Sequence, residues 1–395
     1  MGSQKGMKHP LRVAMVAYAN YFTDARIKNY VDALLDAGAS VDVFALGKEV
    51  GSYSDGNLFV NNVRTKYWGS SALGYIVGQL SFLVQATWRL LMRSFAGRYD
   101  IIHAHNMPNI LALTGLPFKV LGTKVILDVH DTMPEAYATK FGYSLDSLAT
   151  RILVGEEVLS AACADKVITT NIMHKEVLIG HGIPANKIAQ ILNVGNRKIF
   201  KPRPYRAHGH ELWLGYHGTI ARRLGVFLIV DALSFIKEAC PGVRFLCVGE
   251  GDDLAAMKQR AEEKRVTDMV EWKPFVAVEK LPEVLNKVDV GVIGNQRDTE
   301  LKRNYMLPVK MLEYAAMEIP TVGPRLQILE RYFNDTSAFF YEPDDASALA
   351  NAIRAIYNNR SLITARIDGL RKFNAEYNWD IMAERYLTMI NEVVS

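Results

Sequence analysis

The sequence predicts an α/β protein of two domains, each built on a doubly wound parallel sheet. Short apolar runs rich in β-branched residues alternate with segments of helical periodicity, which is the pattern of parallel βαβ units. The alternation stops in a turn-rich stretch at 188–204 and then starts again. A chain of 395 residues also exceeds what one hydrophobic core usually serves.

Predicted strands of the first half lie at 11–17, 41–45, 100–104, 124–129 and 166–170, with a helix at 27–37. Predicted strands of the second half lie at 213–217, 243–248, 270–272, 288–293 and 321–323, with helices at 225–238 and 308–317. We therefore expect an N-terminal domain at 7–197 and a C-terminal domain at 198–375. The final segment, 376–395, holds an amphipathic helix with no strand after it, so we expect it to pack back on the N-terminal domain. Doubly wound sheets bind ligands at the carboxyl ends of their strands, which predicts a site between the two domains.

The overall charge is mildly basic, with a formal net charge of +4 at pH 7. No segment carries the basic stripe of a nucleic-acid-binding element, so we expect no nucleic-acid partner. The three cysteines, Cys163, Cys240 and Cys247, lack metal-ligand spacing and suit reduced, buried thiols. HExxH, CxxC and DxD patterns do not occur in the sequence, so we expect neither a metal nor another cofactor.

Residues 73–92 form a long apolar stretch that polar side chains interrupt, without the run of about 18 apolar residues typical of a membrane span. Trp88, Arg89 and Arg93 suit a helix lying on a membrane surface, with an aromatic body and a cationic rim. The same arginines also suit a packed, half-buried helix from which long side chains reach water. A packed helix, an interfacial helix and a spanning helix all stay open at this point.

A glycine-containing loop at 217–225 (HGTIARRLG) follows a predicted strand and opens a predicted helix. Gly218 allows close approach of the backbone to a ligand, and the helix start offers unpaired amides. Arg222 and Arg223 could pair with a diphosphate. The alternative is a solvated turn with two surface arginines, and the loop alone does not decide between them.

A second candidate, 304–314 (NYMLPVKMLEY), is a loop that runs into a helix with Pro308 at its start. Amides of this helix start would point at whatever lies before it, and Lys310 in the first turn could reach a phosphate. Glu313, one turn later, could accept hydrogen bonds from a ribose diol, and a glutamate in an otherwise apolar helix needs a partner. The alternative is an ordinary Lys310–Glu313 pair on a surface helix.

His130 and Asp131 stand at the end of a predicted strand (VILDVHD), where side chains meet ligands. His130 could hydrogen-bond a sugar hydroxyl, and the alternative is that the two residues stabilise a turn. His103 and His105 share one face of the preceding strand by period two, and we expect them to be structural.

Asp24, in the loop after the first strand, has two interpretations. It could serve the acceptor side of the site, or cap the following helix with Arg26 exposed. The loop lacks GxGxxG, which argues against a dinucleotide site.

These segments, in this order, resemble glycosyltransferase family 4, a group of retaining enzymes with the GT-B fold, in which two Rossmann-like domains face each other across a cleft. The resemblance covers nearly the whole chain and includes YDIIHAHN, VILDVHDTMPE, YHGTIARRLG, FLCVGEGDD and LPVKMLEYAAMEIPTV. It implies that the C-terminal domain holds the nucleotide, that Glu313 binds the ribose, and that His130 contacts the donor sugar.

Site residues follow from the motifs and the resemblance together. The residues expected to carry catalysis are His130, Asp131, Arg222, Arg223 and Lys310. The residues expected to bind the donor are Gly218, Thr219, Glu250, Trp272, Lys273, Pro274, Leu307, Pro308 and Glu313, of which 272–274 would flank the base. Asp24 is expected on the acceptor side.

Two departures from the family pattern bear on these assignments. Tyr305 stands where the family often has a glutamate that handles the transferred sugar, which leaves the sugar open. Leu224 stands where a lysine is usual, so Arg222, Arg223 or Lys310 must supply the positive charge. The LPVK…EY version resembles a subgroup that builds bacterial surface polysaccharides.

The expected activity is transfer of a hexosyl unit, with retention of configuration, from a nucleoside-diphosphate sugar to the hydroxyl of a lipid-linked or polysaccharide precursor. Two alternatives are a nucleotide-sugar epimerase of the same fold and an inactive nucleotide-sugar-binding scaffold. The expected place of action is the cytoplasm, including the inner face of the cell membrane.

Overall fold

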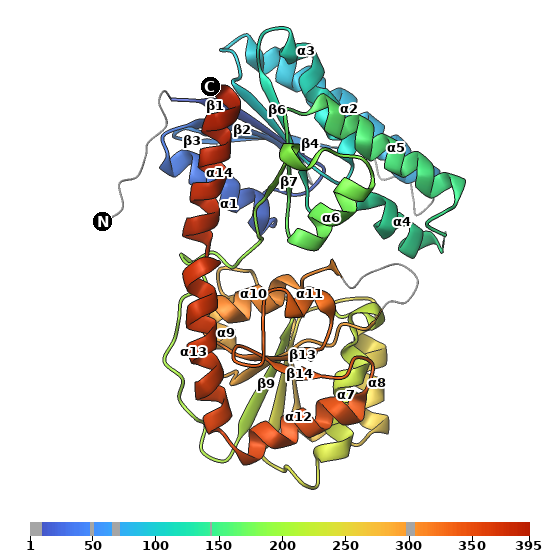
Figure 1. Cartoon of the computed structure of the whole chain (residues 1–395), viewed down its shortest axis with the longest axis vertical. Coiled ribbons are helices and arrows are strands. Elements are labelled where there is room, and N and C mark those ends of the chain that lie inside the picture. Colours follow the sequence, from blue (N-terminus) through green and yellow to red (C-terminus); the bar gives the residue numbers. More distant parts are fainter. Residues whose placement is uncertain (1–9, 48–50, 65–71, 143, 298–304) are drawn as a thin grey trace. The chain divides into compact units, whose positions relative to one another are not determined.

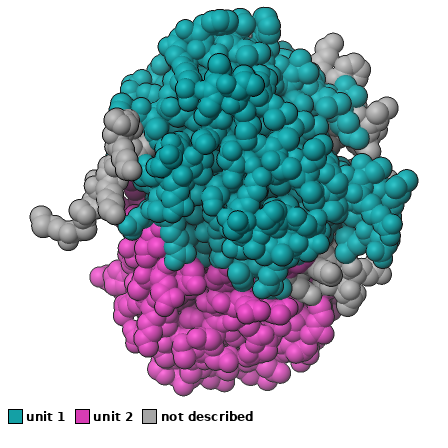
Figure 2. All heavy atoms as spheres, turned by 45° about the horizontal axis from the view of Figure 1, so that its top comes forward, with its two compact units in different colours: residues 1–192, 382–395 teal, residues 193–381 magenta. Residues whose placement is uncertain are grey.

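The computed structural model describes residues 10–47, 51–64, 72–142, 144–297 and 305–395. Residues 7–9 of the predicted first domain and Asn304 of the predicted donor motif lie outside the described residues. The chain forms two compact units, coloured separately in Figure 2: residues 1–192 with 382–395, and residues 193–381.

Unit 1 is built on an eight-stranded sheet with the order β3-β4-β2-β1-β5-β6-β7-β8 (Figure 1). All neighbours are parallel except β3 and β4, which form an antiparallel pair. The strands are β1 (Arg12–Ala17), β2 (Ser40–Leu46), β3 (Gly51–Asp55), β4 (Leu58–Val63), β5 (Ile101–His105), β6 (Lys124–Val129), β7 (Lys166–Thr169) and β8 (Ile188–Gln190).

The helices of unit 1 are divided between the two faces of this sheet. They are α1 (Ala25–Asp36), α2 (Ala72–Ser94), η1 (Asn109–Gly115), α3 (Leu116–Lys119), α4 (Met133–Phe141), α5 (Leu148–Cys163), α6 (Ile172–Gly180), η2 (Ala185–Lys187) and α14 (Trp379–Val394). Phe82 of α2, Phe118 of α3 and Ala161 of α5 share one core with Ile102 and Ala104 of β5. Strand side chains alternate between faces, so α2, α3 and α5 cover one face of the sheet.

The other face of unit 1 is closed by α1 and the last helix, α14. Tyr30 of α1 and Tyr386 of α14 contact each other with ring centroids 4.5 Å apart, and the Tyr386 hydroxyl lies 3.0 Å from His103 Nδ1 on β5. Residues 382–395 thereby belong to unit 1 although they follow unit 2 in the sequence.

Unit 2 is built on a six-stranded parallel sheet with the order β11-β10-β9-β12-β13-β14. Its strands are β9 (Leu212–His217), β10 (Val243–Val248), β11 (Val270–Lys273), β12 (Val290–Val292), β13 (Thr321–Pro324) and β14 (Phe339–Tyr341). Its helices are η3 (Arg222–Leu224), α7 (Val226–Ile236), α8 (Leu254–Glu263), η4 (Thr267–Met269), α9 (Leu281–Leu285), α10 (Val309–Ala316), α11 (Gln327–Glu330), α12 (Ala346–Asn358) and α13 (Ser361–Glu376).

The predicted strands and helices are present within a few residues of the expected positions. Two boundaries between the domains differ from our prediction. The units divide after Leu192, not after residue 197, because the chain that follows already packs on unit 2. A Cβ placed on Gly195 would lie 3.3 Å from the Glu313 Cα, and Phe200 belongs to a core cluster of unit 2. At the other end, unit 2 extends to Ile381, so α14 begins in unit 2 and continues in unit 1.

The segment predicted at 73–92 is the helix α2, which packs one side on the sheet and exposes the other. Its arginines do not form the predicted cationic rim. Arg89 donates to Asn61 on β4, and Arg93 pairs with the buried Asp42 and lies over the Phe59 ring. Both turn inward because the sheet edge offers them acceptors. Among the described residues, no helix is both long enough and apolar enough to span a bilayer.

A buried ion pair joins α1 to the centre of the unit 1 sheet. The helix-cap interpretation of Asp24 left Arg26 exposed, but Arg26 is buried and donates two hydrogen bonds to Asp128, of 2.8 and 2.6 Å. Burial opposes ionisation of Asp128, but Arg26 and His105 outweigh it and hold the carboxyl pKa well below its usual range. The pair therefore stays ionised at neutral pH.

Replacing Arg26 with leucine should lower the free energy of unfolding of unit 1 by about 3–5 kcal/mol, because Asp128 keeps its charge and loses its cation. Urea denaturation of the full chain, followed by circular dichroism, measures this loss. The double variant Arg26→Leu/Asp128→Asn removes both charges and should recover most of it. An unchanged unfolding midpoint in Arg26→Leu would show that the pair does not support the fold.

Candidate active site

The predicted glycine loop begins at the carboxyl end of β9, in the middle of the unit 2 sheet. The chain leaves β9 after His217 and turns at Gly218, whose φ of +105° is a conformation that side chains disfavour. The Gly218 amide donates to Val248 O at 3.0 Å and the Ile220 amide donates to Glu250 O at 2.8 Å. The loop is thereby held along the end of the neighbouring strand, β10.

This close approach requires glycines after β10 as well. A Cβ on Gly249 would lie 2.0 Å from Gly218 O, and one on Gly251 would lie 2.1 Å from Ile220 O. The two backbones therefore pack directly on each other, and the Gly-Glu-Gly sequence is a steric requirement of the loop. Rigid packing of this kind fixes where the backbone near Gly218 points.

Lys310 lies beside Gly218, in the first turn of α10. The helix begins after Pro308, and the Lys310 Nζ lies 3.6 Å from the centroid of the Tyr216 ring. A Cβ on Gly218 would lie 3.9 Å from this Nζ. Burial lowers the Lys310 pKa to about 7, although Glu313 and Cys247 act in the opposite direction. The ammonium is therefore held where it lacks full solvation, and no ion pair joins it to another residue in the described part of the chain.

Glu313, one turn along α10, pairs with a residue that the sequence analysis did not select. Its Oε2 lies 2.7 Å from His217 Nε2, and both side chains are mostly buried. The predicted alternative, a Lys310–Glu313 surface pair, is therefore wrong, because Glu313 turns to His217 and Lys310 turns to Tyr216. His217 holds the Glu313 carboxylate next to the glycine loop.

The two arginines of the loop, equivalent by sequence, differ in the structure. The Arg222 guanidinium stacks on the ring of Phe227 at 4.1 Å, and the Arg222 amide donates to Asp253. Arg223 is close enough to Tyr216 for its charge to act on the Tyr216 hydroxyl. Arg223 is exposed at this end of the sheet, whereas the Arg222 guanidinium is engaged with α7.

The other predicted donor residues lie around the same edge of the unit 2 sheet. Thr219 accepts a 2.7 Å hydrogen bond from the Tyr216 hydroxyl through its carbonyl. Lys273 pairs with Val248 in the sheet and accepts from the Gly249 amide, which places 272–274 next to the glycine loop. The remaining residues are Glu250 and Pro274, which are exposed, Trp272 and Leu307, which are half-buried, and Tyr305, which is buried.

In unit 1, His130 follows β6 in a turn that Asn106 organises. Asn106 Oδ1 accepts from the His130 amide at 3.2 Å, and Asn106 Nδ2 donates to the Asp131 carbonyl at 2.5 Å. The Asn106 side chain thus holds the turn through the backbone of His130 and Asp131. His130 Nδ1 has no hydrogen-bond partner among the described residues. Burial lowers the His130 pKa, so the imidazole is neutral at pH 7.

Asp24 caps α1. Its carboxylate accepts from the amides of Arg26 at 3.0 Å and Ile27 at 3.1 Å. The helix-cap interpretation of Asp24 is therefore the one observed, and a role on the acceptor side stays a prediction.

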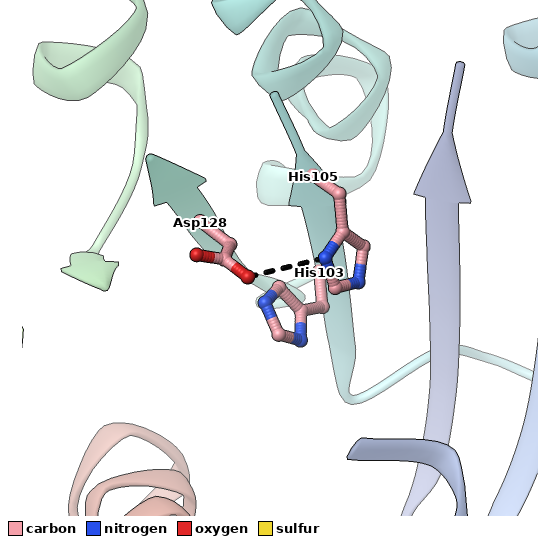
Figure 3. Close-up of side chains that lie close together, drawn as sticks. All are labelled: His103, His105 and Asp128. Atoms are coloured by element: carbon pink, nitrogen blue, oxygen red, sulfur yellow. Dashed lines mark hydrogen bonds and ion pairs between the residues drawn. The ribbon is translucent and has the colours of Figure 1, made fainter. Parts of the chain in front are cut away.

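Three side chains of unit 1 could offer ligand atoms to a metal ion, and Figure 3 shows them together. Ligand atoms of His103, His105 and Asp128 lie within 4.8 Å of one another, and all three residues are buried. Arg26 already neutralises Asp128, so a divalent ion would stand beside a guanidinium. We assign this cluster to the fold, as expected for the two histidines, and metal-independent activity stays a prediction.

Two segments of the chain match known protein families, which together cover most of its length. Residues 23–193 match the family described as "Glycosyl transferase 4-like domain", and residues 211–359 match "Glycosyl transferases group 1". The chain belongs to the group 1 glycosyltransferases. It is thus a hexosyltransferase that uses a nucleotide sugar, which confirms the activity class that the motifs predicted.

Curated relatives and solved structures agree with this membership. The D-inositol 3-phosphate glycosyltransferase of Pseudarthrobacter chlorophenolicus is 22% identical over 350 residues, 84% of this chain and 81% of that protein. A putative colanic acid biosynthesis glycosyltransferase, WcaL of Escherichia coli K12, is 26% identical over 44% of this chain and 43% of its own. Anabaena Alr3699/HepE, solved with UDP and glucose, superposes with a TM-score of 0.71 and 14% identity over 97% of this chain and 100% of its own. The fold is therefore GT-B, as predicted.

The lowered pKa of Lys310 makes binding of a nucleoside diphosphate pH-dependent. The anion needs the ammonium form, and the protonated fraction of the free protein falls as pH rises through about 7. Between pH 7.5 and 9 we expect affinity to fall about tenfold per pH unit. Calorimetry should also show proton uptake on binding.

The variant Lys310→Arg is the matched control, because arginine stays charged over this range. Its affinity should be nearly flat between pH 7.5 and 9. Equal slopes for the wild type and Lys310→Arg would contradict the assignment of Lys310 to the diphosphate.

Proposed function

We propose that the protein transfers a hexosyl unit with retention of configuration, and that its donor diphosphate is bound by Lys310, Arg223 and the amides of the glycine loop. The observation that carries this proposal is the half-buried Lys310 ammonium at the start of α10, 3.6 Å from the Tyr216 ring and beside Gly218. A partly desolvated cation that forms no ion pair with the described residues is what an empty diphosphate site presents.

The chemistry needs positive charge where the leaving diphosphate gains negative charge. Lys310 and Arg223 supply the positive charge, and the start of α10 supplies oriented amides. These groups stabilise the leaving group without a metal, so we propose metal-independent transfer. The leaving phosphate itself takes the proton of the acceptor hydroxyl.

Glu313 serves the ribose in this proposal. Its carboxylate accepts hydrogen bonds from the ribose diol, while His217 holds it in place through the 2.7 Å contact. His130 contacts the transferred sugar. Its neutral imidazole has a free Nδ1 among the described residues, which suits a hydrogen bond to a sugar hydroxyl.

The acceptor we propose is a lipid-linked or polysaccharide precursor, reached in the cytoplasm or at the inner face of the cell membrane. Two observations support it: the resemblance of the LPVK…EY motif to polysaccharide-building enzymes, and the similarity of part of the chain to WcaL, which is named for colanic acid biosynthesis.

Arg223 and Arg222 give a matched pair for testing the diphosphate clamp. A thermal-shift panel of UDP-, GDP-, ADP- and CDP-sugars first selects the donor, and steady-state kinetics then compares the two alanine variants. Arg223→Ala should lower kcat by about 10²–10³-fold, the range for loss of one group that stabilises a developing anion. Arg222→Ala should stay within about threefold, because that guanidinium stacks on Phe227. Equal losses, or none in either variant, would refute the clamp.

A further inference from the structure

We propose that unit 1 docks on the surface of a lipid bilayer through the outward side of α2, the segment after α3, and α5, which we call the apolar outer face. This inference goes beyond the donor site, because none of its residues takes part in donor binding. A protein that does not bind lipid would therefore say nothing against the proposed diphosphate site.

The longest part of the apolar outer face is a stripe along α2. Ile76, Leu80, Val84, Trp88 and Met92 recur every four residues and are all exposed, Val84 by 68% and Trp88 by 61%. On the opposite side of the same helix, Phe82, Ala86 and Leu90 are fully buried. The helix therefore already has a core side, and the exposed stripe is a second apolar side that the fold leaves open.

The end of α2 continues into a second exposed segment. Phe95 is exposed by 85% and Val120, just after α3, by 87%, with Leu121 also exposed. The Arg98 guanidinium lies against Gly122, 3.1 Å from the position of a Cβ there. This contact brings the chain after α2 next to the chain after α3, so the two segments form one surface.

The helix α5 adds the third part. Leu148, Ile152 and Leu159 are exposed, while Ala161 packs in the same core as Phe82 of α2 and Phe118 of α3. Both α2 and α5 contact η1. The helices α2, α3 and α5 cover one face of the unit 1 sheet (Figure 1). Their exposed sides therefore point away from that face together, as one broad layer.

The charges of this layer favour an anionic lipid surface over a protein partner. Residues 72–98 and 116–124 contain no aspartate or glutamate, and Arg98, just after α2, is exposed. On α5, Arg151 is exposed, whereas Glu157 is buried against His181. An apolar layer with tryptophan and phenylalanine, with Arg98 and Arg151 exposed beside it and no acidic residue on α2, suits insertion at the level of the headgroups.

The test is flotation of the full chain with phosphatidylcholine vesicles and with vesicles that also contain phosphatidylglycerol. The wild type should float with both, and more with the anionic mixture. The variant Trp88→Ser/Phe95→Ser/Val120→Ser should lose about tenfold or more in partitioning, because three large apolar side chains no longer leave water. Arg98→Glu should weaken binding to the anionic vesicles only.

The matched control is Phe235→Ser/Ile179→Ser, which replaces two exposed apolar side chains outside the apolar outer face and should float as the wild type does. Circular dichroism shows that each variant is folded. Quenching of tryptophan fluorescence by brominated lipid gives a second readout. The quenching should decrease in Trp88→Phe, whereas flotation of this variant should persist because an aromatic side chain is kept.

Three results would overturn the proposal. The first is a wild type that floats with neither vesicle, and the second is a triple variant that floats equally well. The third is a dimer, seen by light scattering, that the triple variant breaks into monomers while no vesicle binds, because the face would then serve a second copy of the chain.

Discussion

The proposed donor site of unit 2 depends on holding the half-buried Lys310 side chain over the ring of Tyr216. Desolvation lowers the lysine pKa to about 7, so in the empty site the amine is close to half protonated at neutral pH. The surrounding features keep it there: Gly249 and Gly251 let two loops pack backbone on backbone, and His217 holds Glu313 away from the ammonium. A diphosphate then gains a full charge interaction without rearrangement of the loop, which is the preorganisation that transfer of a sugar from a phosphate leaving group requires.

Both units place charged side chains at the carboxyl ends of their strands, but the charges differ in how they are balanced. In unit 1, Asp128 receives two hydrogen bonds from Arg26 and a third contact from His105, so its charge is balanced within the fold. In unit 2, Lys310 lies over the Tyr216 ring, and none of the described residues forms an ion pair with it. A balanced buried charge supports structure, whereas an unbalanced one next to a helix start marks a ligand site.

The sequence predicted the two parallel sheets, the group 1 family and the contiguous motifs around Gly218, Lys310 and Glu313, because each of these lies in one short stretch. It did not reveal β3, whose residues are all exposed, its neighbour β4, or β8 and β14, which have three residues each. Its main errors concern partners distant in the chain. Glu313 meets His217, 96 residues away, and the buried Arg26 meets Asp128, 102 residues away. Likewise, Arg222 and Arg223 became distinguishable only when Phe227 and Tyr216 were placed beside them.

The most direct test of this account is a titration of Lys310 itself by NMR, with ¹³C-labelled lysine and the Lys310→Arg variant to assign the signal. In the free protein the Lys310 signal should titrate with a pKa near 7. In the complex with a nucleoside diphosphate its pKa should rise above the ordinary lysine value, about 10.4, because the bound anion stabilises the ammonium. A Lys310 signal that titrates at the ordinary lysine value in the free protein, or that does not respond to the diphosphate, would contradict the account.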